Sequence, residues 1–314
     1  MKFQLAAATL ATVLGALSLP VQAQTVGSAS LATHRDCSSV TAAQVCDGSG
    51  PGQTIVTRSY GGGVGIGGFN SLDIGSGNFA WSDIGFGAFD LPEIRAFTQA
   101  AGNVRMNINA FGFQSFLFSG PSGTPFSLTG NLNIVNSSSN PLGGALPGGA
   151  IYSQYVGIWN PSVLAGLTTA QELFNALFYA DCSTSGVLGF GSSFGDLPGG
   201  PQNYSASTSA CSAGSLDLVS GQEVVVVAGL QLPVNRGGFA DSSATFKTTF
   251  DQTLSPQTLA ALQAGLTSAE ARGVPLVNIP AVPEPATWAT MILGFFMAGG
   301  LIRRRNLRTA PATA

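Results

Sequence analysis

The sequence predicts a mainly β protein, an antiparallel β-sandwich of jelly-roll-like form with two short helices. Several short runs alternate apolar and polar residues, as strands with one buried face do. Glycine and proline, at 42 and 17 of the 314 residues, separate these runs and supply turns. Only 9% of residues are charged, against roughly 25% in typical soluble proteins. Hydrophobic residues make up 45%, which is enough to build a core.

Four stretches carry the strand prediction. Residues 103–120 alternate in polarity, with a bend expected at Gly112. Residues 125–135 place four apolar side chains on one face. Residues 223–232 form a continuous apolar run, which predicts a central strand with both faces covered. Residues 243–254 alternate again, as expected for a strand with one face in water.

Two stretches predict helices that cover the sandwich. Residues 168–182 begin with a capping box formed by Thr169 and Glu172. Residues 255–266 begin with Ser255 as N-cap, and a proline follows in the first turn. In both stretches large apolar residues recur three or four positions apart, so each helix has one apolar face to bury.

The first 23 residues have the pattern of a secretory signal peptide. Lys2 gives a positive start, residues 5–19 form an apolar run, and Ala23 ends a small-residue cleavage pattern. We expect signal peptidase to cut after Ala23, once the general secretion machinery has exported the chain. An N-terminal membrane anchor is disfavoured, because the run is short for a bilayer core of roughly 30 Å. Cleavage leaves residues 24–272 as the predicted secreted β-sandwich domain.

The C-terminal part combines a proline-rich stretch, an apolar run and a basic cluster. Residues 273–285 are rich in proline and predict an extended stalk. Residues 286–302 carry no charge, and their 17 residues would make about 25 Å of helix. This length is at the short edge of a transmembrane segment. The arginines that follow would hold the end of the span on the cytoplasmic side.

This order of proline motif, apolar span and basic stop involves a specific set of residues: Pro283, Glu284, Pro285, Trp288, Ala289, Gly294, Arg303, Arg304 and Arg305. Over residues 283–306 it resembles the PEP-CTERM sorting signal in its PEPxxWA form. The resemblance implies that an exosortase, a membrane-embedded cysteine transpeptidase-like enzyme, recognises and cuts the tail. It also implies that the mature protein reaches the cell surface or the extracellular polymer. An ordinary single-pass anchor with a proline-rich stalk is the alternative.

The exported residues 24–285 are acidic. They hold seven Lys and Arg residues against all 15 Asp and Glu residues of the chain, a net charge of minus eight. Nucleic acid and anionic lipid are bound by clustered Lys and Arg. The composition therefore disfavours nucleic acid as a partner.

Four cysteines lie in the exported part, where disulfides persist. They allow three pairings. Proximity in the sequence favours Cys37 with Cys46 and Cys182 with Cys211. Free thiols are one alternative, and a metal site that includes His34, the only histidine, is another. The spacing matches no zinc pattern.

Residues 60–90 are rich in glycine and contain a short repeat, "DIGSG" from Asp73 and "DIGFG" from Asp83. The repeat suits two arms of a hairpin or successive turns of a sheet. Together with Asp90, these aspartates are weak candidates for a calcium site, which needs six or more oxygen ligands. Solvated turn aspartates are the more ordinary interpretation. No cofactor is predicted.

No catalytic residue is predicted, because His34 has no evident partner for a nucleophile triad. Paired carboxylates for glycoside hydrolysis could be offered by two pairs, Asp90 with Glu93 or Asp217 with Glu223. Exposed aromatic residues could stack on sugars, although most aromatic side chains belong to the core of a sandwich. The candidates are Trp81, Trp159, Tyr60, Tyr152 and Tyr155.

The sequence and the resemblance together predict a secreted, non-enzymatic protein of the cell surface or extracellular matrix. The resemblance implies an association with exopolysaccharide and biofilm, in a structural or glycan-binding role. A secreted glycan-processing enzyme of the glycoside hydrolase type is the alternative. The expected partners are signal peptidase and the secretion machinery, an exosortase, and exopolysaccharide.

Overall fold

The computed structural model describes the part of the chain that folds into β-sheets. The described residues are 26–36, 54–62, 68–101, 103–138, 150–164, 175–176, 181–212, 215–235, 237–269 and 271–272. The chain divides into two units, Met1–Val277 and Asn278–Ala314, and every described residue belongs to the first.

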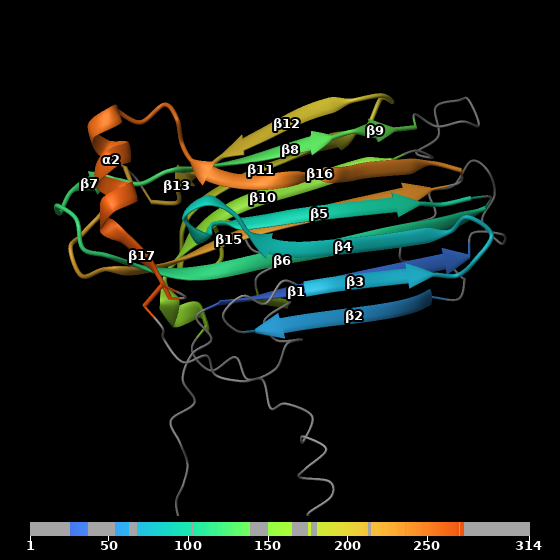
Figure 1. Ribbon diagram of the computed structural model, residues 1–314, viewed down its shortest axis with the longest axis horizontal. Coiled ribbons are helices and arrows are strands. Elements are labelled where there is room, and N and C mark those ends of the chain that lie inside the picture. Colours follow the sequence, from blue (N-terminus) through green and yellow to red (C-terminus); the bar gives the residue numbers. More distant parts are fainter. Residues whose placement is uncertain are drawn as a thin grey trace, which may run out of the picture. The chain divides into compact units, whose positions relative to one another are not determined.

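The described residues of this unit form two antiparallel sheets and a small two-stranded sheet (Figure 1). The eight-stranded sheet has the order β13-β11-β10-β15-β6-β1-β2, and β17 also pairs with β6. Its strands are β1 (Val26–Asp36), β2 (Thr54–Gly62), β6 (Val104–Phe118), β10 (Ile151–Trp159), β11 (Val187–Asp196), β13 (Ser209–Ala210), β15 (Glu223–Asn235) and β17 (Leu266–Ser268).

The seven-stranded sheet has the order β12-β8-β16-β5-β4-β3, and β9 also pairs with β16. Its strands are β3 (Gly68–Asp73), β4 (Phe79–Phe86), β5 (Pro92–Gln99), β8 (Leu128–Ile134), β9 (Asn136–Ser137), β12 (Gln202–Ser207) and β16 (Phe239–Phe250). In Figure 1 this sheet lies in front of the eight-stranded one. The two-stranded sheet joins β7 (Thr124–Pro125) and β14 (Asp217–Leu218).

Part of the core lies between the two large sheets, which confirms the prediction of a mainly β sandwich. One buried cluster joins Ile108 of β6 and Leu230 of β15 to Ile94 of β5 and Phe246 of β16. These side chains are fully buried, and they come from alternate positions of strands in both sheets. Packing of two sheet faces on each other is the arrangement expected of an aligned β-sandwich.

Three of the strand predictions are confirmed in detail. The run at 223–232 is the central strand β15, which pairs with β10 on one side and β6 on the other. Its residues Val224–Leu230 are buried on both faces. Strand β8 buries one face, as predicted for residues 125–135. In β16, Phe246 and Phe250 are buried whereas Lys247 is exposed, so one face is wet.

Strand β6 is continuous through Gly112, where a bend was expected. Strand β6 pairs with β1 and β15 through this position without a change of register. The glycine is needed for another reason, because a Cβ at this position would lie 2.9 Å from Cγ2 of Ile84 and 3.3 Å from Cβ of Pro92. The two sheets therefore approach each other closely at Gly112, and a larger residue would force them apart.

The second predicted helix is present as α2 (Pro256–Gly265). Its N-cap is Ser255, whose Oγ accepts a hydrogen bond from the backbone N of Thr258 at 3.1 Å. Leu262 is fully buried and fixes the helix on the core. Of the first predicted helix, residues 168–182, the structure describes Asn175 and Ala176, which are helical, and Asp181 and Cys182, which are not. Two 3₁₀ turns, η1 (Ala88–Asp90) and η2 (Pro161–Leu164), complete the described elements.

The two ends of the described domain meet on strand β6. Val26, the first residue of β1, faces Gln114, and Ser268, the last residue of β17, faces Phe116. The backbone N of Ala269 then donates to the carbonyl of Ser115 at 2.8 Å. Strand β17 therefore continues the edge of β6 that β1 covers, and the chain enters and leaves at neighbouring positions.

One of the two favoured disulfides is present, between Cys182 and Cys211. These residues are 29 positions apart in the sequence, and their Cα atoms lie 5.0 Å apart. The bridge holds the segment that precedes β11 against the end of β13. Cys37 and Cys46 lie outside the described residues.

The predicted signal peptide (1–23), stalk (273–285), transmembrane segment (286–302) and sorting signal (283–306) all lie outside the described residues. Within the described part, no helix has the length and apolar character needed to cross a bilayer. These predictions therefore rest on the sequence.

Candidate functional site

The outer face of the seven-stranded sheet carries aromatic side chains that point away from the core. Along β4, Phe79, Trp81 and Asp83 are partly exposed, whereas the residues between them are fully buried. Strand β3 repeats this pattern, with Phe69 exposed and Asn70 buried. Since side chains alternate across a strand, the aromatic residues share the outer face.

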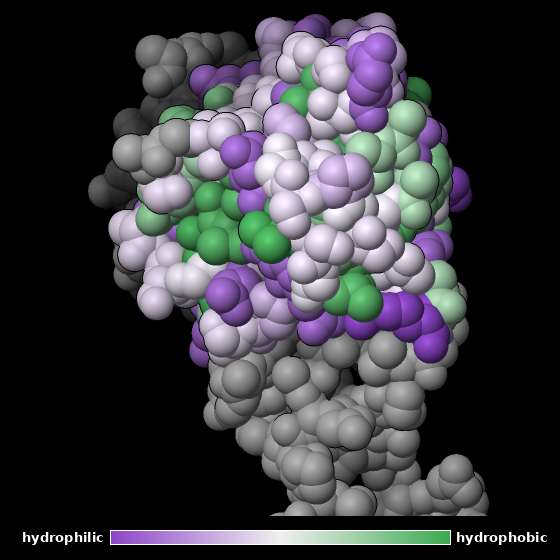
Figure 2. All heavy atoms as spheres, turned by 90° about the vertical axis from the view of Figure 1, so that its left-hand side faces the viewer, coloured by the Kyte–Doolittle hydropathy of each residue, from purple (hydrophilic) through white to green (hydrophobic). Residues whose placement is uncertain are grey.

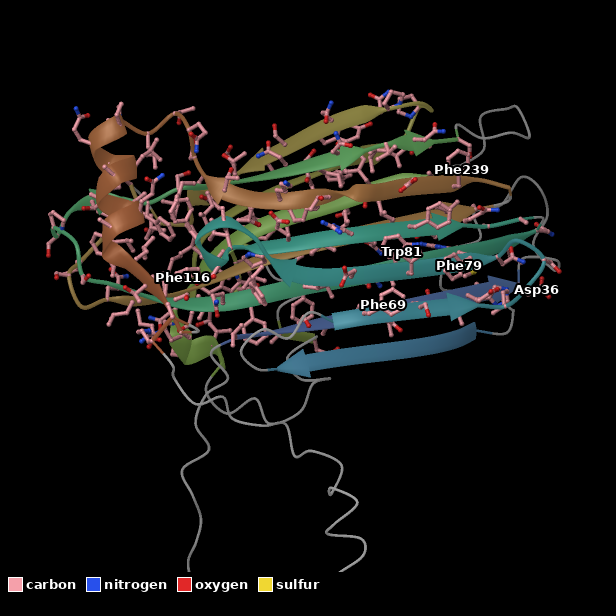
Figure 3. All side chains as sticks on the ribbon, viewed as in Figure 1. Asp36, Phe69, Phe79, Trp81, Phe116 and Phe239 are labelled. Carbon is pink, nitrogen blue, oxygen red and sulfur yellow. A yellow bond between two sulfur atoms is a disulfide. The ribbon has the colours of Figure 1, made fainter. Side chains whose placement is uncertain are left out.

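Five residues from four neighbouring strands make up this surface, which we call the aromatic face: Phe69 of β3, Phe79 and Trp81 of β4, Phe97 of β5 and Phe239 of β16. Phe69 is 61% exposed, and the other four are partly exposed. Figure 3 labels Phe69, Trp81, Phe79 and Phe239, which run obliquely across the sheet from β3 to β16. Aromatic groups gathered in this way on a surface are typical of binding sites.

The rings of the aromatic face hold one another in place. The ring centres of Phe69 and Trp81 are 6.4 Å apart, with 25° between the ring planes. Those of Phe79 and Phe97 are 6.2 Å apart, with 44° between the planes. Both pairs join diagonal positions on adjacent strands, which aromatic side chains span readily. The mutual packing restricts the rotamers before any ligand arrives.

Polar residues alternate with the rings. Three rows of cross-strand neighbours cross the sheet, namely Phe69, Asp83 and Arg95; Ser71, Trp81, Phe97 and Asp241; and Asp73, Phe79, Gln99 and Phe239. Every ring therefore has a carboxylate, amide, hydroxyl or guanidinium group beside it. Such a surface can cover the apolar face of a ring-shaped ligand and also hydrogen-bond to groups at its edge.

Beyond β16 the same face of the sheet becomes polar. Nδ2 of Asn133 on β8 donates to Oδ1 of Asn203 on β12 at 3.0 Å. The hydroxyls of Thr129 and Ser207, on the same two strands, lie 3.0 Å apart. These side chains bond to each other across the strand pair. The aromatic face is therefore bounded by a polar surface on this side.

Of the aromatic residues proposed from the sequence, Trp81 lies on the aromatic face. Trp159, Tyr152 and Tyr155 are 1%, 5% and 7% exposed, which places them in the core. All three belong to β10. Tyr152 lies in the cluster that the two large sheets share, whereas Tyr155 and Trp159 lie in a separate buried cluster formed by the eight-stranded sheet. Burial also raises the pKa of the Tyr155 hydroxyl well above its ordinary value. The side chain of Tyr60 lies outside the described residues.

Sequence reasoning missed the other four members of the aromatic face. Phenylalanine usually belongs to the core, so Phe79 and Phe97 read as buried positions. A charged residue two positions away on the same strand could have indicated that these aromatic side chains lie on the outer face. Asp83 stands two residues after Trp81, and Arg95 stands two residues before Phe97, so each charged residue shares a face with an aromatic one.

The calcium candidates are not gathered into one site. Oδ1 of Asp73 accepts a hydrogen bond from the backbone N of Gly75 at 2.8 Å, in the turn between β3 and β4. Asp83 lies within β4, and Asp90 accepts a hydrogen bond from Ser268. Among the residues that the structure describes, no group of three or more His, Cys, Asp or Glu side chains could hold a metal ion.

The carboxylates considered for glycoside hydrolysis have structural neighbours. Oε1 of Glu223 lies 2.9 Å from Nη2 of Arg272, and Oδ2 of Asp217 accepts from Ser215 at 2.9 Å. Oδ2 of Asp90 accepts from Ser268 at 2.5 Å. Glu93 faces Lys247 across the β5–β16 pair. Three of these carboxylates, those of Asp90, Asp217 and Glu223, therefore bond to a polar side chain, and Glu93 lies opposite a lysine.

His34 is buried on β1, with 8% of its surface exposed. Neither ring nitrogen has a hydrogen-bond partner within the described part of the chain. Burial lowers the pKa of His34 below its ordinary value, and the nearby charge of Asp36 offsets only part of this effect. The imidazole is therefore neutral near pH 7.

The end of the sandwich beside α2 is a less suitable site. Figure 2 looks at this end and shows apolar residues as separate patches among neutral and polar ones. Phe89 is 50% exposed there, but its ring packs on Phe250 with the ring centres 5.4 Å apart. The aromatic face is therefore the strongest candidate for a binding surface.

No protein-family model matches the chain, and no curated protein matches it. The chain is similar to a solved structure described as "Structural basis for the promiscuous specificity of the carbohydrate- binding modules from the beta-sandwich super family". The two share 10% sequence identity, and the match covers 72% of this chain and 75% of that chain with a TM-score of 0.23. A likeness of this size carries no argument about the ligand of this chain.

Proposed function

We propose that this protein is an exported, non-enzymatic glycan-binding protein of the cell surface or extracellular matrix. The observation that supports the proposal is the aromatic face, above all the stacked pair of Phe69 and Trp81 on an outer sheet surface. A sugar ring has an apolar C–H face and a rim of hydroxyl groups. The alternation of rings and polar side chains on the aromatic face matches both parts of such a ligand.

Replacement of Trp81 by alanine tests the proposal. The wild-type domain and the variant are titrated with the exopolysaccharide recovered from the producing cells. We expect Trp81→Ala to weaken binding at least about tenfold, since truncating a central aromatic contact removes more than ~1 kcal/mol and tenfold corresponds to ~1.4 kcal/mol.

Phe194→Ala is the matched control, because Phe194 is 80% exposed but lies on β11 in the other sheet. It should leave binding unchanged, and circular dichroism should show that both variants are folded. Equal binding by wild type, Trp81→Ala and Phe69→Ala would rule out the aromatic face as the binding site.

The non-enzymatic part of the proposal has its own test. Each acid of the exported domain is replaced by alanine, and cleavage of the same polysaccharide is measured. We expect no cleavage by the wild type beyond a blank, and no dependence on any single acid. Measurable cleavage that is lost on replacement of one or two carboxylates would identify a glycan-processing enzyme instead.

We also propose that the chain is exported by its signal peptide and released when an exosortase cuts at the tail. The support is the sequence order of Pro283, Glu284 and Pro285, the apolar span and the arginine cluster. Peptide mapping of protein recovered outside the cell should find residues of the β-sandwich but none of 290–306. Recovery of the complete tail in the extracellular fraction would contradict this proposal.

A further inference from the structure

We infer that the ligand of the aromatic face is an extended, uncharged glycan chain that lies obliquely across strands β3, β4, β5 and β16. The inference rests on the proposed glycan-binding function and adds the length, direction and charge of the ligand. Two independent features of the surface carry it, namely the spacing of the rings and the formal charge around them.

The length follows from the register of the four strands. Phe69 lies in the row of Asp83, whereas Trp81 and Phe97 share the next row, and Phe239 lies one row further. Three strand intervals of ~4.8 Å and two row steps of ~6.8 Å place the ends of this line ~20 Å apart. A single sugar ring covers only part of such a line, so the surface suits a chain of several rings.

The direction follows from the same line. Phe69, Trp81, Phe97 and Phe239 follow one another on successive strands, and Phe79 lies beside them on β4. Figure 3 labels Phe69, Trp81 and Phe239 of this course, and Phe79 beside it. A glycan chain on this course would stack on one aromatic residue of each strand and meet the polar residues of the rows at its edges.

The charge follows from the outer positions of these strands. Among the described outer residues of β3, β4, β5 and β16, the carboxylates are those of Asp73, Asp83, Glu93 and Asp241, and the cations are those of Arg95 and Lys247. The formal charge is therefore negative. A uronate chain would bring further carboxylates against this surface, at a cost of ~1 kcal/mol for each pair about 4 Å apart in water.

The test compares four probes on the mature domain by isothermal titration calorimetry. They are glucose, a neutral β-1,4-glucose hexamer, a neutral β-1,4-mannose hexamer and a galacturonate hexamer. We expect at least one neutral hexamer to bind at least about tenfold more tightly than glucose and than the uronate hexamer. Raising the salt concentration should strengthen binding of the uronate hexamer but not of the neutral hexamers, because screening weakens the repulsion between carboxylates. The difference in affinity between the two kinds of hexamer should therefore become smaller.

Asp83→Asn supplies a second measurement. It removes the carboxylate that lies directly beside Phe69, so it should improve binding of the uronate hexamer by about threefold relative to the neutral one. Asp217→Asn is the matched control, since Asp217 is exposed but lies on β14. It should change neither affinity.

The outcomes separate the inference from the proposed function. The uronate hexamer could bind more tightly than either neutral hexamer, with this binding weakened by Trp81→Ala. That result would support a glycan-binding face but overturn the inference that the ligand is uncharged. Glucose that binds as tightly as the hexamers would overturn the inferred length. Absence of binding to all four probes and to the exopolysaccharide would remove the proposed function, and the inference with it.

Discussion

Nη2 of Arg272 lies 2.9 Å from Oε1 of Glu223, and both groups also contact the buried hydroxyl of Ser115. The ion pair joins the last described residue to the start of β15. Next to it, Oγ of Ser268 donates to Asp90. These contacts fasten the end of the folded domain to the sandwich at the point where the predicted stalk begins.

Breaking this ion pair should cost modest stability. Arg272→Met and Glu223→Gln should each lower the free energy of unfolding by about 1 kcal/mol, because both side chains are partly exposed. Urea unfolding of the two single variants and the double variant forms a cycle that isolates the pair. If the two single effects simply add, the residues do not interact and the contact contributes nothing.

Loss of the Cys182–Cys211 bridge should cost more. Closing a loop over a sequence separation of 29 restricts the unfolded chain, and the chain-entropy model gives ~3.6 kcal/mol. The variant with both cysteines replaced by serine should therefore unfold at a clearly lower urea concentration. An unchanged midpoint in non-reducing buffer would mean that the bridge does not form in the purified protein.

Stability should fall on mild acidification because of His34. The folded state lowers its pKa, so the unfolded chain takes up the proton first, near pH 6.5. The stabilising effect of the neutral ring is complete above that pH and is lost as the pH falls below it towards the lower pKa of the folded state. The free energy of unfolding, followed from about pH 8 to about pH 5, should decline less steeply in His34→Gln. Parallel curves for the two proteins would assign the decline to other groups.

Gly112→Ala should destabilise the sandwich by about 1–3 kcal/mol, because the added Cβ would press on Ile84 and Pro92 of the facing sheet. Gly85→Ala is the control, since no atom lies within 4 Å of a Cβ at that position on β4. Thermal unfolding measures both. Equal melting temperatures for the two variants would show that the sheets can move apart at Gly112 without cost.

The strands were predictable because apolar and polar residues alternate along them, and this alternation requires only that one face of each strand packs on the core. The apolar run at residues 223–232 predicted a central strand, and the alternation around Phe246 predicted which side is wet. The close approach of the facing sheet at Gly112 was not predicted. A glycine in a strand can mark either a bend or a close approach of another chain segment, and the sequence of one strand does not contain the facing residue.

The aromatic face was harder to predict than the sandwich. Next to the rings its strands bury small residues such as Ala80 and Ala96, whereas the larger Trp81 is partly exposed, the reverse of the usual preference at these positions. In β10 the opposite holds, since Tyr155 and Trp159 are buried beside the central strand. Strands β4 and β5 are interior strands of their sheet, as β10 is, so pairing order does not decide between these outcomes. What packs on each face of a sheet decides, and that depends on the whole chain.

Because its two ends lie side by side on β6, the β-sandwich domain is suited to insertion into another protein. Val26 and Ser268 face positions of β6 that are two residues apart, so the first and last strands of the domain end close to each other. The domain could therefore be inserted into a surface loop of another protein without forcing the two ends of that loop apart. A short linker between these ends would likewise permit a circular permutant with new ends at the exposed turn around Ser76, far along the chain from either original terminus.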